Sequence, residues 1–425
     1  MNSGGRGAAF FKRQGARTLK TLTKTMLAAS AAAMAIAFGA TAAQAKIGDV
    51  FVIAMENQNS SVSGPNASGL NPIYGNSAAP YINSLITPGN PNSTYTSYSS
   101  AYHNIILNPT TDLHPSEPNY IWQVSGRTGP LTDAVPSTGN GNLFAPGTPN
   151  LGTSLTNAGL TWKSYQEGID TTGGNSSSAV VTNTIAPTNQ WTVPNQNFSG
   201  TNPGYTNPYN GSHQYNYAAK HNPFVFFQDD YNAANYAPLQ QLQTDLSNNT
   251  VANFNWITPD QYNDMHSTLT GGFTYNGTHY TGNQANIAQG DNFLSQIVPQ
   301  IEASQAFQDN GLIVIWTDED EGDDPSSNTN YSNMEILIGH DTKGNAFTSL
   351  VPMNHNTDLE TYLQLWDLNQ AGYPANVSQW GTFAPLLKAG AIPEPTTWAM
   401  LLLGFFGLGA GLRSRKTATS AVAGA

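Results

Sequence analysis

The sequence predicts an α/β fold in which helices flank a mainly parallel central sheet. Short apolar runs, typical of strands that are buried on both faces, alternate along the chain with segments of helical character. Two of these runs end in acidic residues: 49–55 leads into Glu56, and 311–316 leads through Thr317 into Asp318. Strands that end in carboxylates build ligand sites at the carboxyl edge of an open α/β sheet, so we expect the functional site at this edge.

Each element is predicted from its own pattern. In the longest predicted helix, Phe293, Ile297 and Ile301 fall near one face. Asp291 is placed to cap this helix, and Pro299 predicts a kink or a break in it. The predicted strands are 49–55, 224–227, 254–257, 311–316 and 335–338, and the predicted helices are 79–85, 119–124, 239–246, 291–307 and 357–365.

Two long segments interrupt this alternation. Residues 171–212 are rich in Asn, Thr, Ser, Gly and Pro, and residues 267–289 are rich in Gly, Thr and Tyr. We expect both at the surface, and the second as a hairpin insertion. Pro238 suits the first position of the predicted helix 239–246.

The first 45 residues predict an export signal. Lys12, Arg13 and further basic residues precede an apolar, alanine-rich stretch at 26–39, and Ala43-Gln44-Ala45 fits the small-x-small cleavage rule. The mature chain is therefore expected to start at Lys46. A membrane anchor is the alternative, but the apolar stretch is short for one.

Composition excludes several function classes. The chain has no cysteine, which rules out disulfides, thiolate metal sites and thiol nucleophiles. Residues 46–392 contain six basic and twenty-six acidic residues, a net charge of −20, so this region lacks a basic patch for nucleic acid. An anionic substrate would need cations to neutralise its pocket.

The C-terminal segment has its own organisation. Pro393-Glu394-Pro395 is followed by the fifteen uncharged residues 398–412 and then by Arg413, Arg415 and Lys416. A helix of this length covers about 22 Å, less than the roughly 30 Å hydrocarbon core of a membrane. The segment resembles the PEP-CTERM sorting signal of Gram-negative bacteria. The resemblance implies export, transient retention at the inner membrane, and contact with the sorting and processing machinery. It assigns residues 391–416 to the signal and 417–425 to a tail beyond it.

Candidate metal ligands follow the predicted strands. Glu56 and Asn57 come directly after 49–55, and Asp318 and Glu319 follow the 311–316 run. Hard oxygen ligands without thiols suit a divalent cation, whose identity among Zn, Mn, Fe, Mg and Ca stays open. Solvated turn acids, a generic acidic loop and a calcium-binding loop are the alternatives.

Imidazoles accompany these acids. Asp264 and His266 are two residues apart, which on an extended backbone places both side chains on one face. His355 lies just before a predicted helix and adds a further imidazole. A hydrogen-bonded surface pair and an ordinary loop histidine are the alternatives.

Ser116 is the candidate nucleophile. It precedes Pro118, which suits the first turn of a helix, so Ser116 either caps that helix or uses the helix N-terminus and a cation to stabilise its alkoxide. His114 would orient substrate or shuttle a proton. Lys220 is a candidate contact for an anionic substrate, with a solvated surface lysine as the alternative.

The order of these blocks resembles the phosphoesterase family of bacterial acid phosphatases and phospholipases C, within the alkaline-phosphatase-like superfamily. The resemblance spans about residues 48–368. The matching blocks are Val52-Ile-Ala-Met-Glu-Asn57, Leu113-His-Pro-Ser-Glu-Pro-Asn-Tyr120, Lys220-His-Asn-Pro-Phe-Val-Phe-Phe227, Thr258-Pro259 with Asn263-Asp-Met-His266, Trp316-Thr-Asp-Glu-Asp320, Ile336-Leu-Ile-Gly-His340 and Asn354-His355.

The resemblance implies a role for each candidate. Ser116 would form a phosphoseryl intermediate beside a metal ion, and His114 would assist it. The metal ligands would be Glu56, Asn57, Asp318 and Glu319, with Asp264, His266 and His355 at or around a second position, and the substrate-binding residues would be Lys220, His221 and Asn119.

Two residues depart from the family pattern. Glu117 stands where a leucine is common, and Asn356 stands where a tyrosine is usual. Neither is a proposed ligand, but both bear on substrate preference.

The sequence thus predicts an exported, metal-dependent phosphoesterase with a serine nucleophile, similar to acid phosphatases, in a catalytic domain at 46–390. Its expected location is the periplasm, the outer surface or the medium of a Gram-negative bacterium. One alternative is a phospholipase C, which should expose an aromatic rim from Trp122, Trp162, Trp191 and Tyr262. Another is a non-enzymatic, metal-binding protein of the extracellular matrix, which the Asn/Ser/Thr/Gly-rich composition favours. Substrate, pH optimum and oligomeric state are left open.

Overall fold

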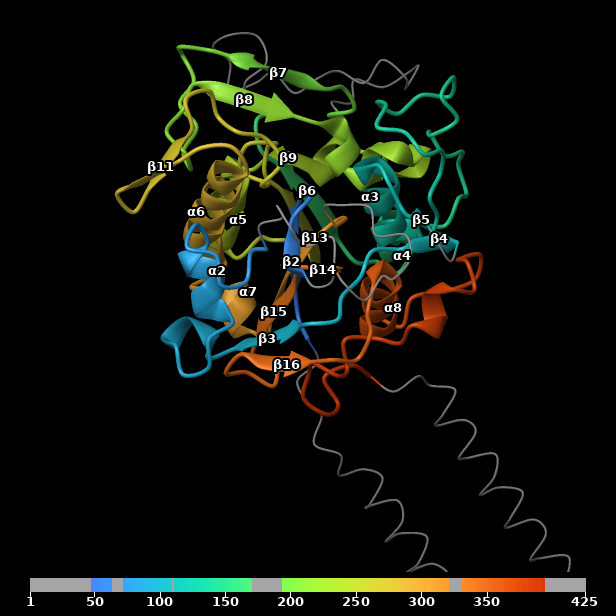
Figure 1. The fold of residues 1–425 in the computed structure, drawn as a ribbon. Coiled ribbons are helices and arrows are strands. Elements are labelled where there is room, and N and C mark those ends of the chain that lie inside the picture. The colour runs from blue at the N-terminus through green and yellow to red at the C-terminus, as the bar shows by residue number, and fades with distance from the viewer. Residues whose placement is uncertain (1–46, 63–71, 109–110, 170–192, 321–330, 394–425) are drawn as a thin grey trace, which may run out of the picture. The chain divides into compact units, whose positions relative to one another are not determined.

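Eight strands form the central sheet of the computed structural model, which describes residues 47–62, 72–108, 111–169, 193–320 and 331–393 (Figure 1). Neighbouring strands are parallel except where β15 pairs with β13 and β3, so the sheet is mainly parallel, as predicted. The strand order is β16 (Phe347–Ser349), β3 (Thr96–Ser99), β15 (Glu335–Gly339), β13 (Leu312–Thr317), β1 (Val50–Met55), β10 (Phe254–Thr258), β6 (Trp162–Gln166) and β9 (Tyr236–Pro238).

Helices cover both faces of this sheet (Figure 1). The side chains of β1 alternate between two cores: Val50 and Val52 pack with one set of helices, and Phe51 and Ile53 pack with the other. All six residues of β1 are buried, which is why the run lacks polar alternation. The first set contains α3 (Ser116–Ser125), α4 (Leu151–Asn157) and α8 (His355–Leu365), and the second contains α2 (Pro80–Leu85), α5 (Gln240–Asn248), α6 (Asn283–Glu302) and α7 (Gln305–Gln308).

Strand register places the acidic strand ends together. Met55, the last residue of β1, pairs in parallel with Thr317, the last residue of β13. The next residue on each strand is therefore an acid, Glu56 on one and Asp318 on the other. On its other side β1 pairs with β10, and the segment after β10 leads to Asp264.

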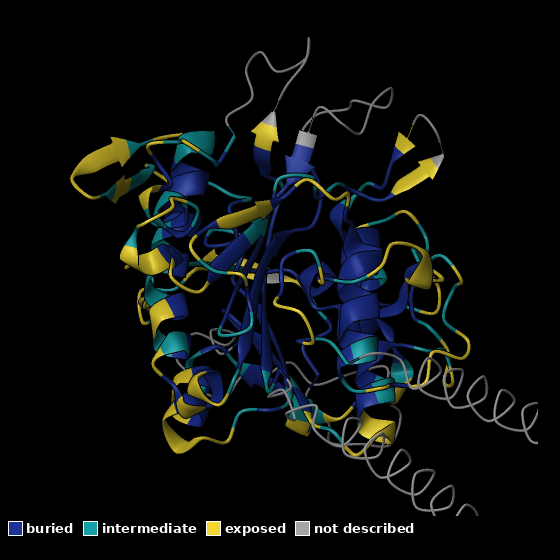
Figure 2. Cartoon of the chain, turned by 90° about the horizontal axis from the view of Figure 1, so that it is seen from below, coloured by how far each residue is buried: buried dark blue, intermediate teal, exposed yellow. Residues whose placement is uncertain are grey.

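Four separate two-stranded antiparallel sheets and six short 3-10 turns complete the described fold. Figure 2 shows that exposed residues gather in the loops and outer strands, whereas the central sheet and the helix faces turned to it are buried. The paired strands are β2 (Asn59–Val62) with β14 (Tyr331–Asn333), β4 (Ile106–Asn108) with β5 (Thr111–Asp112), β7 (Phe198–Thr201) with β8 (Gln214–Tyr217), and β11 (Phe273–Tyr275) with β12 (Thr278–Tyr280). The 3-10 turns are η1 (Pro91–Ser93), η2 (Ala219–His221), η3 (Pro223–Phe226), η4 (Gln228–Asp230), η5 (Ala233–Asn235) and η6 (Val377–Gln379).

The predicted strand 224–227 is wrong. These residues form the 3-10 turn η3 and its end, and their apolar side chains are buried against the α3 side of the sheet. A short apolar run does not distinguish a strand from another buried segment, and Pro223 lacks the amide hydrogen that a ladder position needs. Pro238 likewise ends the edge strand β9, where a proline is tolerated, and α5 starts two residues later.

The predicted helix 291–307 differs from the observed elements in three respects. It starts earlier, at Asn283, so only the first part of 267–289 is the expected hairpin. Pro299 lies inside α6, and the break comes after Glu302, where Ser304 caps the separate α7. Asp291 lies in mid-helix instead of at a start. Its carboxylate accepts hydrogen bonds from the backbone amides of Tyr81 and Ile82, at 2.9 and 2.7 Å, and so caps α2.

Several predicted segments lie outside the described residues. These are the export signal at 1–45, the part of the polar stretch at 171–192, and the sorting segment and tail from 394 onward. Within the described ranges, no helix is long and apolar enough to cross a membrane.

The cap on α2 predicts a stability change. Asp291→Ala leaves two amides of the first turn without their acceptors, and it should lower the free energy of unfolding by about 1–2 kcal/mol. Asp291→Asn keeps one acceptor oxygen and should lose less. Chemical denaturation measures both values. An alanine variant as stable as the parent chain would show that α2 does not depend on this carboxylate.

Candidate active site

The carboxyl edge of the sheet brings most of the predicted residues together. Glu56 and Asn57 follow β1, and Asp318 and Glu319 follow β13. Ser116 is the first residue of α3 rather than its cap, a position that Pro115 takes without a side-chain hydrogen bond. The 3-10 turn η2 contributes Lys220 and His221, and the segment after β10 contributes Asp264 and His266.

Ser116 lies between a cation and an acid. Its Oγ is 3.3 Å from the Nζ of Lys220 and 3.3 Å from Oε1 of Glu319. All three side chains are buried. The serine hydroxyl therefore has one donor and one acceptor within reach, which holds its oxygen at the N-terminus of α3.

Asp133 connects this helix to the lysine. One of its carboxylate oxygens accepts a hydrogen bond from the backbone amide of Glu117 at 3.1 Å, and the other lies 3.0 Å from the Nζ of Lys220. Asp133 was not predicted. It is the one acidic residue in the stretch between α3 and α4, which was the only sequence signal for it.

Four residues with side-chain oxygens, Glu56, Asn57, Asp318 and Glu319, lie together next to Ser116. The terminal amide atom of Asn57 that faces the carboxylates lies 3.0 Å from Oε2 of Glu56 and 3.1 Å from Oε1 of Glu319. Asp318 accepts a hydrogen bond from the backbone amide of Asn57 through Oδ1, at 3.0 Å, and its Oδ2 is buried without a hydrogen-bond partner among the described residues. Either the Asn57 amide nitrogen donates to both glutamates, or its oxygen faces them and a cation is needed to offset the repulsion.

His221 occupies the other side of Glu56. Its Nε2 lies 2.6 Å from Oε1 of Glu56, and its Nδ1 lies 3.2 Å from Oδ2 of Asp264. The first contact is close, but it lacks the angles of a hydrogen bond. The ring of Tyr120 stacks on the imidazole at 4.8 Å between centroids. His221, predicted as a substrate contact, thus lies buried among the carboxylates.

The segment with Asp264 and His266 is a turn, not the extended backbone predicted. Met265 between them has a φ of +85°, in the left-handed region, and the amide of His266 donates to Oδ1 of Asp264 at 2.8 Å. Gly290 of α6 makes room for this turn, since a Cβ there would meet Cγ of Met265 at 2.3 Å. Both side chains still face Glu56, with Nε2 of His266 3.8 Å from its Oε2.

His355 does not face the cluster in the way expected of a metal ligand. Its Nε2 lies 2.6 Å from the backbone carbonyl oxygen of Asp318, and its Nδ1 lies 2.7 Å from the hydroxyl of Tyr102. Both ring nitrogens therefore already have partners, and His221 is the imidazole that lies beside Glu56 and Asp264.

Asn119 contacts the same glutamate. Its amide nitrogen donates to Oε2 of Glu319 at 3.1 Å and to the carbonyl of Leu113 at 2.7 Å, and the residue is fully buried. It therefore helps to orient Glu319, and its role as a substrate contact stays a prediction.

Burial and neighbouring positive charges shift the pKa values of the site acids in opposite directions. Burial raises the pKa of Asp318, Glu319 and Asp264, because these carboxyls lose water, and the negative charge of Glu56 raises each pKa further. Burial would also raise the pKa of Glu56, but the charges of His221 and Lys220 outweigh it and hold that pKa below its usual range.

The donor set fits a divalent cation, although not every ligand is in place. Among the described residues, no three carboxylate or imidazole side chains are arranged to hold a metal ion as they stand. The buried Oδ2 of Asp318 nevertheless has no hydrogen-bond partner among the described residues, and the carboxylates of Glu56, Asp318 and Glu319 supply the hard oxygen atoms that a divalent cation prefers.

Three side chains of the site are half-buried, those of Asn57, His114 and His266. The aromatic rim expected of a phospholipase is only partly present. Trp162 is buried in the core, Trp191 lies outside the described residues, and Trp122 donates a hydrogen bond to Asn356 at 2.8 Å. Tyr262 is partly exposed.

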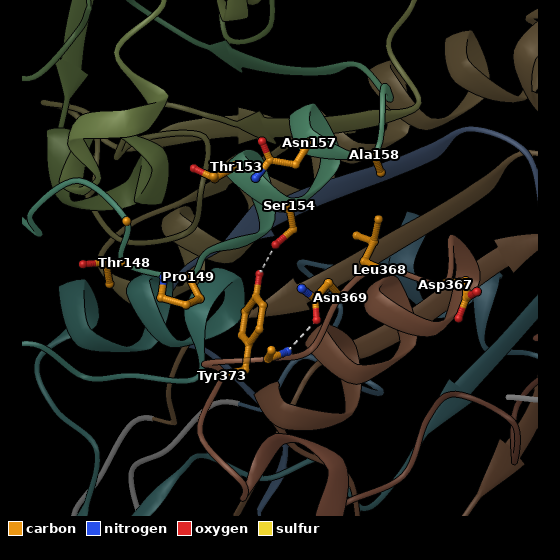
Figure 3. Close-up of a pocket in the computed structure, with 12 residues that line it drawn as sticks. Thr148, Pro149, Thr153, Ser154, Asn157, Ala158, Asp367, Leu368, Asn369 and Tyr373 are labelled. Atoms are coloured by element: carbon orange, nitrogen blue, oxygen red, sulfur yellow. Dashed lines mark hydrogen bonds between the residues drawn. The ribbon is translucent and has the colours of Figure 1, made fainter. Parts of the chain in front are cut away.

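A separate cavity of about 440 Å³ lies between α4 and the segment that follows α8 (Figure 3). The hydroxyls of Ser154 and Tyr373 meet in it at 2.9 Å. It is lined by none of the site acids or histidines, so it is distinct from the cluster around Ser116.

Comparison with known proteins gives three kinds of match. The Phosphoesterase family matches residues 104–345. Phosphatidylinositol-3-phosphatase of Mycobacterium tuberculosis is 24% identical over 304 residues, which cover 72% of this chain and 75% of that protein. Solved structures match at low identity. A protein in the alkaline phosphatase superfamily from Vibrio parahaemolyticus has 12% identity and a TM-score of 0.40, covering 76% of this chain and 67% of that one. Murine ectonucleotide pyrophosphatase/phosphodiesterase 5 has 9% identity and a TM-score of 0.42, covering 80% of this chain and 100% of that one.

The contact between His114 and Glu319 predicts a shifted titration. Burial opposes the charged imidazole, but the hydrogen bond and charge of Glu319, 2.9 Å away, raise the pKa of His114 to about 9. In the metal-free protein, NMR should show the His114 ring losing its proton near pH 9. In Glu319→Gln the pKa should fall toward the usual value of about 6.5. A His114 pKa near 6.5 in the parent chain would contradict this pairing.

Proposed function

This chain belongs to the phosphoesterase family and is a hydrolase of phosphoric ester bonds, and we propose that it is an exported, metal-dependent enzyme with Ser116 as its nucleophile. The observation that carries the proposal is the position of Ser116. Its hydroxyl lies at the start of α3, within 3.3 Å of both Lys220 and Glu319, and Glu319 follows Asp318, whose buried Oδ2 has no hydrogen-bond partner among the described residues. A phosphate ester would reach it past the half-buried side chains of His114 and His266.

In this mechanism Ser116 attacks phosphorus and its hydroxyl proton passes to Glu319, whose raised pKa suits a proton acceptor. Lys220 and the amides of the first turn of α3 stabilise the oxygen that bears the developing charge. His114, protonated at neutral pH, supplies a proton to the departing alcohol oxygen. It then takes a proton from the water that hydrolyses the phosphoserine, and Glu319 returns its proton to the released Ser116 oxygen.

The residues that would hold the cation are Glu56, Asn57, Asp318 and Glu319. When bound, a divalent cation polarises the phosphoryl oxygens and makes the serine hydroxyl more acidic. A second cation position would lie at the other carboxylate oxygen of Glu56. The side chains around it are those of His221, Asp264 and His266. His221 takes the place there that the sequence assigned to His355.

A phosphomonoester is the first candidate substrate, and a phospholipid is the second. The matched mycobacterial relative is a phosphatidylinositol-3-phosphatase.

One feature of this chain also favours a lipid substrate. The β4–β5 hairpin just before Ser116 exposes Ile106 and Leu107 by 45% and 38%, and Leu131 near Asp133 is 56% exposed. Such residues would contact acyl chains or a membrane surface. A phospholipase C activity on head groups remains a finer alternative within this class, whereas a non-enzymatic matrix role does not agree with the family.

We also propose export and sorting through the two ends of the chain. The basic and apolar pattern of residues 1–45 and the PEP-CTERM-like segment at 391–416 support this location at the periplasm or outer surface.

Hydrolysis assays test the proposed chemistry. The mature chain should hydrolyse p-nitrophenyl phosphate, lose activity with a chelator and regain it with a divalent cation. Ser116→Ala should lower turnover by several orders of magnitude with metal content unchanged, because only the nucleophile is removed. Acid quenching should trap phosphate on Ser116 in the parent chain. If Ser116→Ala keeps most of the activity, a water molecule attacks directly and the serine is not the nucleophile.

Parallel assays on phosphatidylinositol 3-phosphate vesicles and on phosphatidylcholine separate the substrate candidates. If the lipid substrate is correct, Leu107→Ser should slow hydrolysis in vesicles but not that of p-nitrophenyl phosphate. If the parent chain and Leu107→Ser hydrolyse the vesicle substrate at equal rates, the exposed β4–β5 hairpin is not a lipid contact.

Mass spectrometry of the protein released by its own host tests the export proposal. It should find Lys46 at the N-terminus and no peptide from residues 398–412. A chain that keeps both ends and stays in the cytoplasm would contradict it.

A further inference from the structure

We propose that Tyr102, His355 and Asp358 form a buried hydrogen-bonded chain that fixes the backbone at Asp318 and ties it to the helix of the nucleophile. His355 is then a positioning residue and not a metal ligand. The inference deepens the proposed function, on which it rests for the role of Asp318 and Ser116.

The chain is continuous in space although its members are far apart in sequence. Nε2 of His355 lies 2.6 Å from the carbonyl oxygen of Asp318, and Nδ1 lies 2.7 Å from the Tyr102 hydroxyl. The same hydroxyl lies 2.7 Å from Oδ2 of Asp358. Gln123 closes the connection, since its amide nitrogen donates to Oδ1 of Asp358 at 2.7 Å.

This path joins the two halves of the active site. Gln123 belongs to α3, the helix that begins at Ser116, and Asp358 and His355 belong to the first turn of α8. The carbonyl at the other end belongs to Asp318, directly after β13. A shift of α3 relative to β13 would therefore break at least one hydrogen bond of this chain. The chain thus fixes the distance between Ser116 and the backbone at Asp318.

The proton positions are consistent with a clamp. A carbonyl oxygen only accepts, so Nε2 of His355 must carry the hydrogen that points to Asp318. The Tyr102 hydroxyl lies between Nδ1 of His355 and Oδ2 of Asp358, and it donates its one hydrogen to Asp358.

Packing holds the imidazole in this orientation. Tyr102, His355 and Asp358 have no measurable exposure. The ring of Trp316, in β13, meets the imidazole edge-on at 5.0 Å between centroids. To ligate a metal, His355 would have to give up a hydrogen bond at one nitrogen and turn inside this packed shell. Positioning therefore agrees better with the geometry than ligation does.

Three variants separate positioning from ligation. His355→Gln can place an amide donor near the original Nε2 and so keep the bond to Asp318. His355→Asn is shorter and does not reach that carbonyl. Tyr102→Phe removes the central hydroxyl and keeps the ring. Tyr362→Phe is the matched control, because Tyr362 is a buried tyrosine of α8 whose hydroxyl has no hydrogen-bond partner among the described residues.

The first readout needs neither metal nor activity. In the metal-free full-length protein, hydrogen exchange at residues 317–319 should be at least about tenfold faster in Tyr102→Phe and His355→Asn than in Tyr362→Phe. His355→Gln should stay within a fewfold of the parent chain. If Tyr102→Phe matches Tyr362→Phe, the chain does not fix this backbone and the proposal is wrong.

The second readout is the Mn²⁺ dissociation constant, measured by calorimetry on the stripped protein. Loss of a group that orients a ligand typically costs 10–100-fold in metal affinity, so Tyr102→Phe and His355→Asn should weaken binding about tenfold or more, and His355→Gln by less. A His355→Gln variant that loses Mn²⁺ as completely as Asp318→Asn would make His355 a ligand and overturn the proposal. A parent chain that binds no divalent cation would instead contradict the proposed function, and the exchange result would still decide the positioning role.

Discussion

The site depends on the burial of four carboxylates at one edge of the sheet. The parallel register of β1 and β13 places Glu56 and Asp318 side by side, and Glu319 and Asp264 complete the group. Buried ionised acids are costly unless positive charge compensates them. The surrounding residues follow from this need. Lys220 and His221 come from the same 3-10 turn, and Oδ2 of Asp318 has no hydrogen-bond partner among the described residues.

Backbone geometry near the acids supports the same interpretation. Asn57 and Met265 both have positive φ, at 39° and 85°, directly beside Glu56 and Asp264. Asparagine tolerates this region, but a methionine there is uncommon and is kept only where surrounding packing demands it. Gly290 provides the space that this packing requires. The fold thus accepts local strain to aim Asp264 and His266 at the shared glutamate.

Sequence patterns predicted the sheet and the acids at its edge, because both depend on contiguous residues. Apolar runs such as 49–55 must be buried on both faces, and residues that directly follow paired parallel strands must share an edge. The features that the sequence did not predict depend on contacts between residues that are far apart in the chain. The turn at Met265 requires Gly290, the partners of His355 include Tyr102, and Asp133 meets Lys220 from a loop without regular structure. The buried run at 224–227 has the composition of a strand, and only its tertiary setting makes it a 3-10 turn.

The central claim is that a cation, Ser116 and the strand-end acids form one site. High-resolution anomalous diffraction from crystals grown with Mn²⁺ tests it most directly, because it locates the metal independently of activity. We expect a peak coordinated by oxygen atoms of Asn57, Asp318 and at least one of the two glutamates, next to Oγ of Ser116. A peak elsewhere on the chain, or an Asn57 amide nitrogen that donates to both glutamates with no metal between them, would contradict the account.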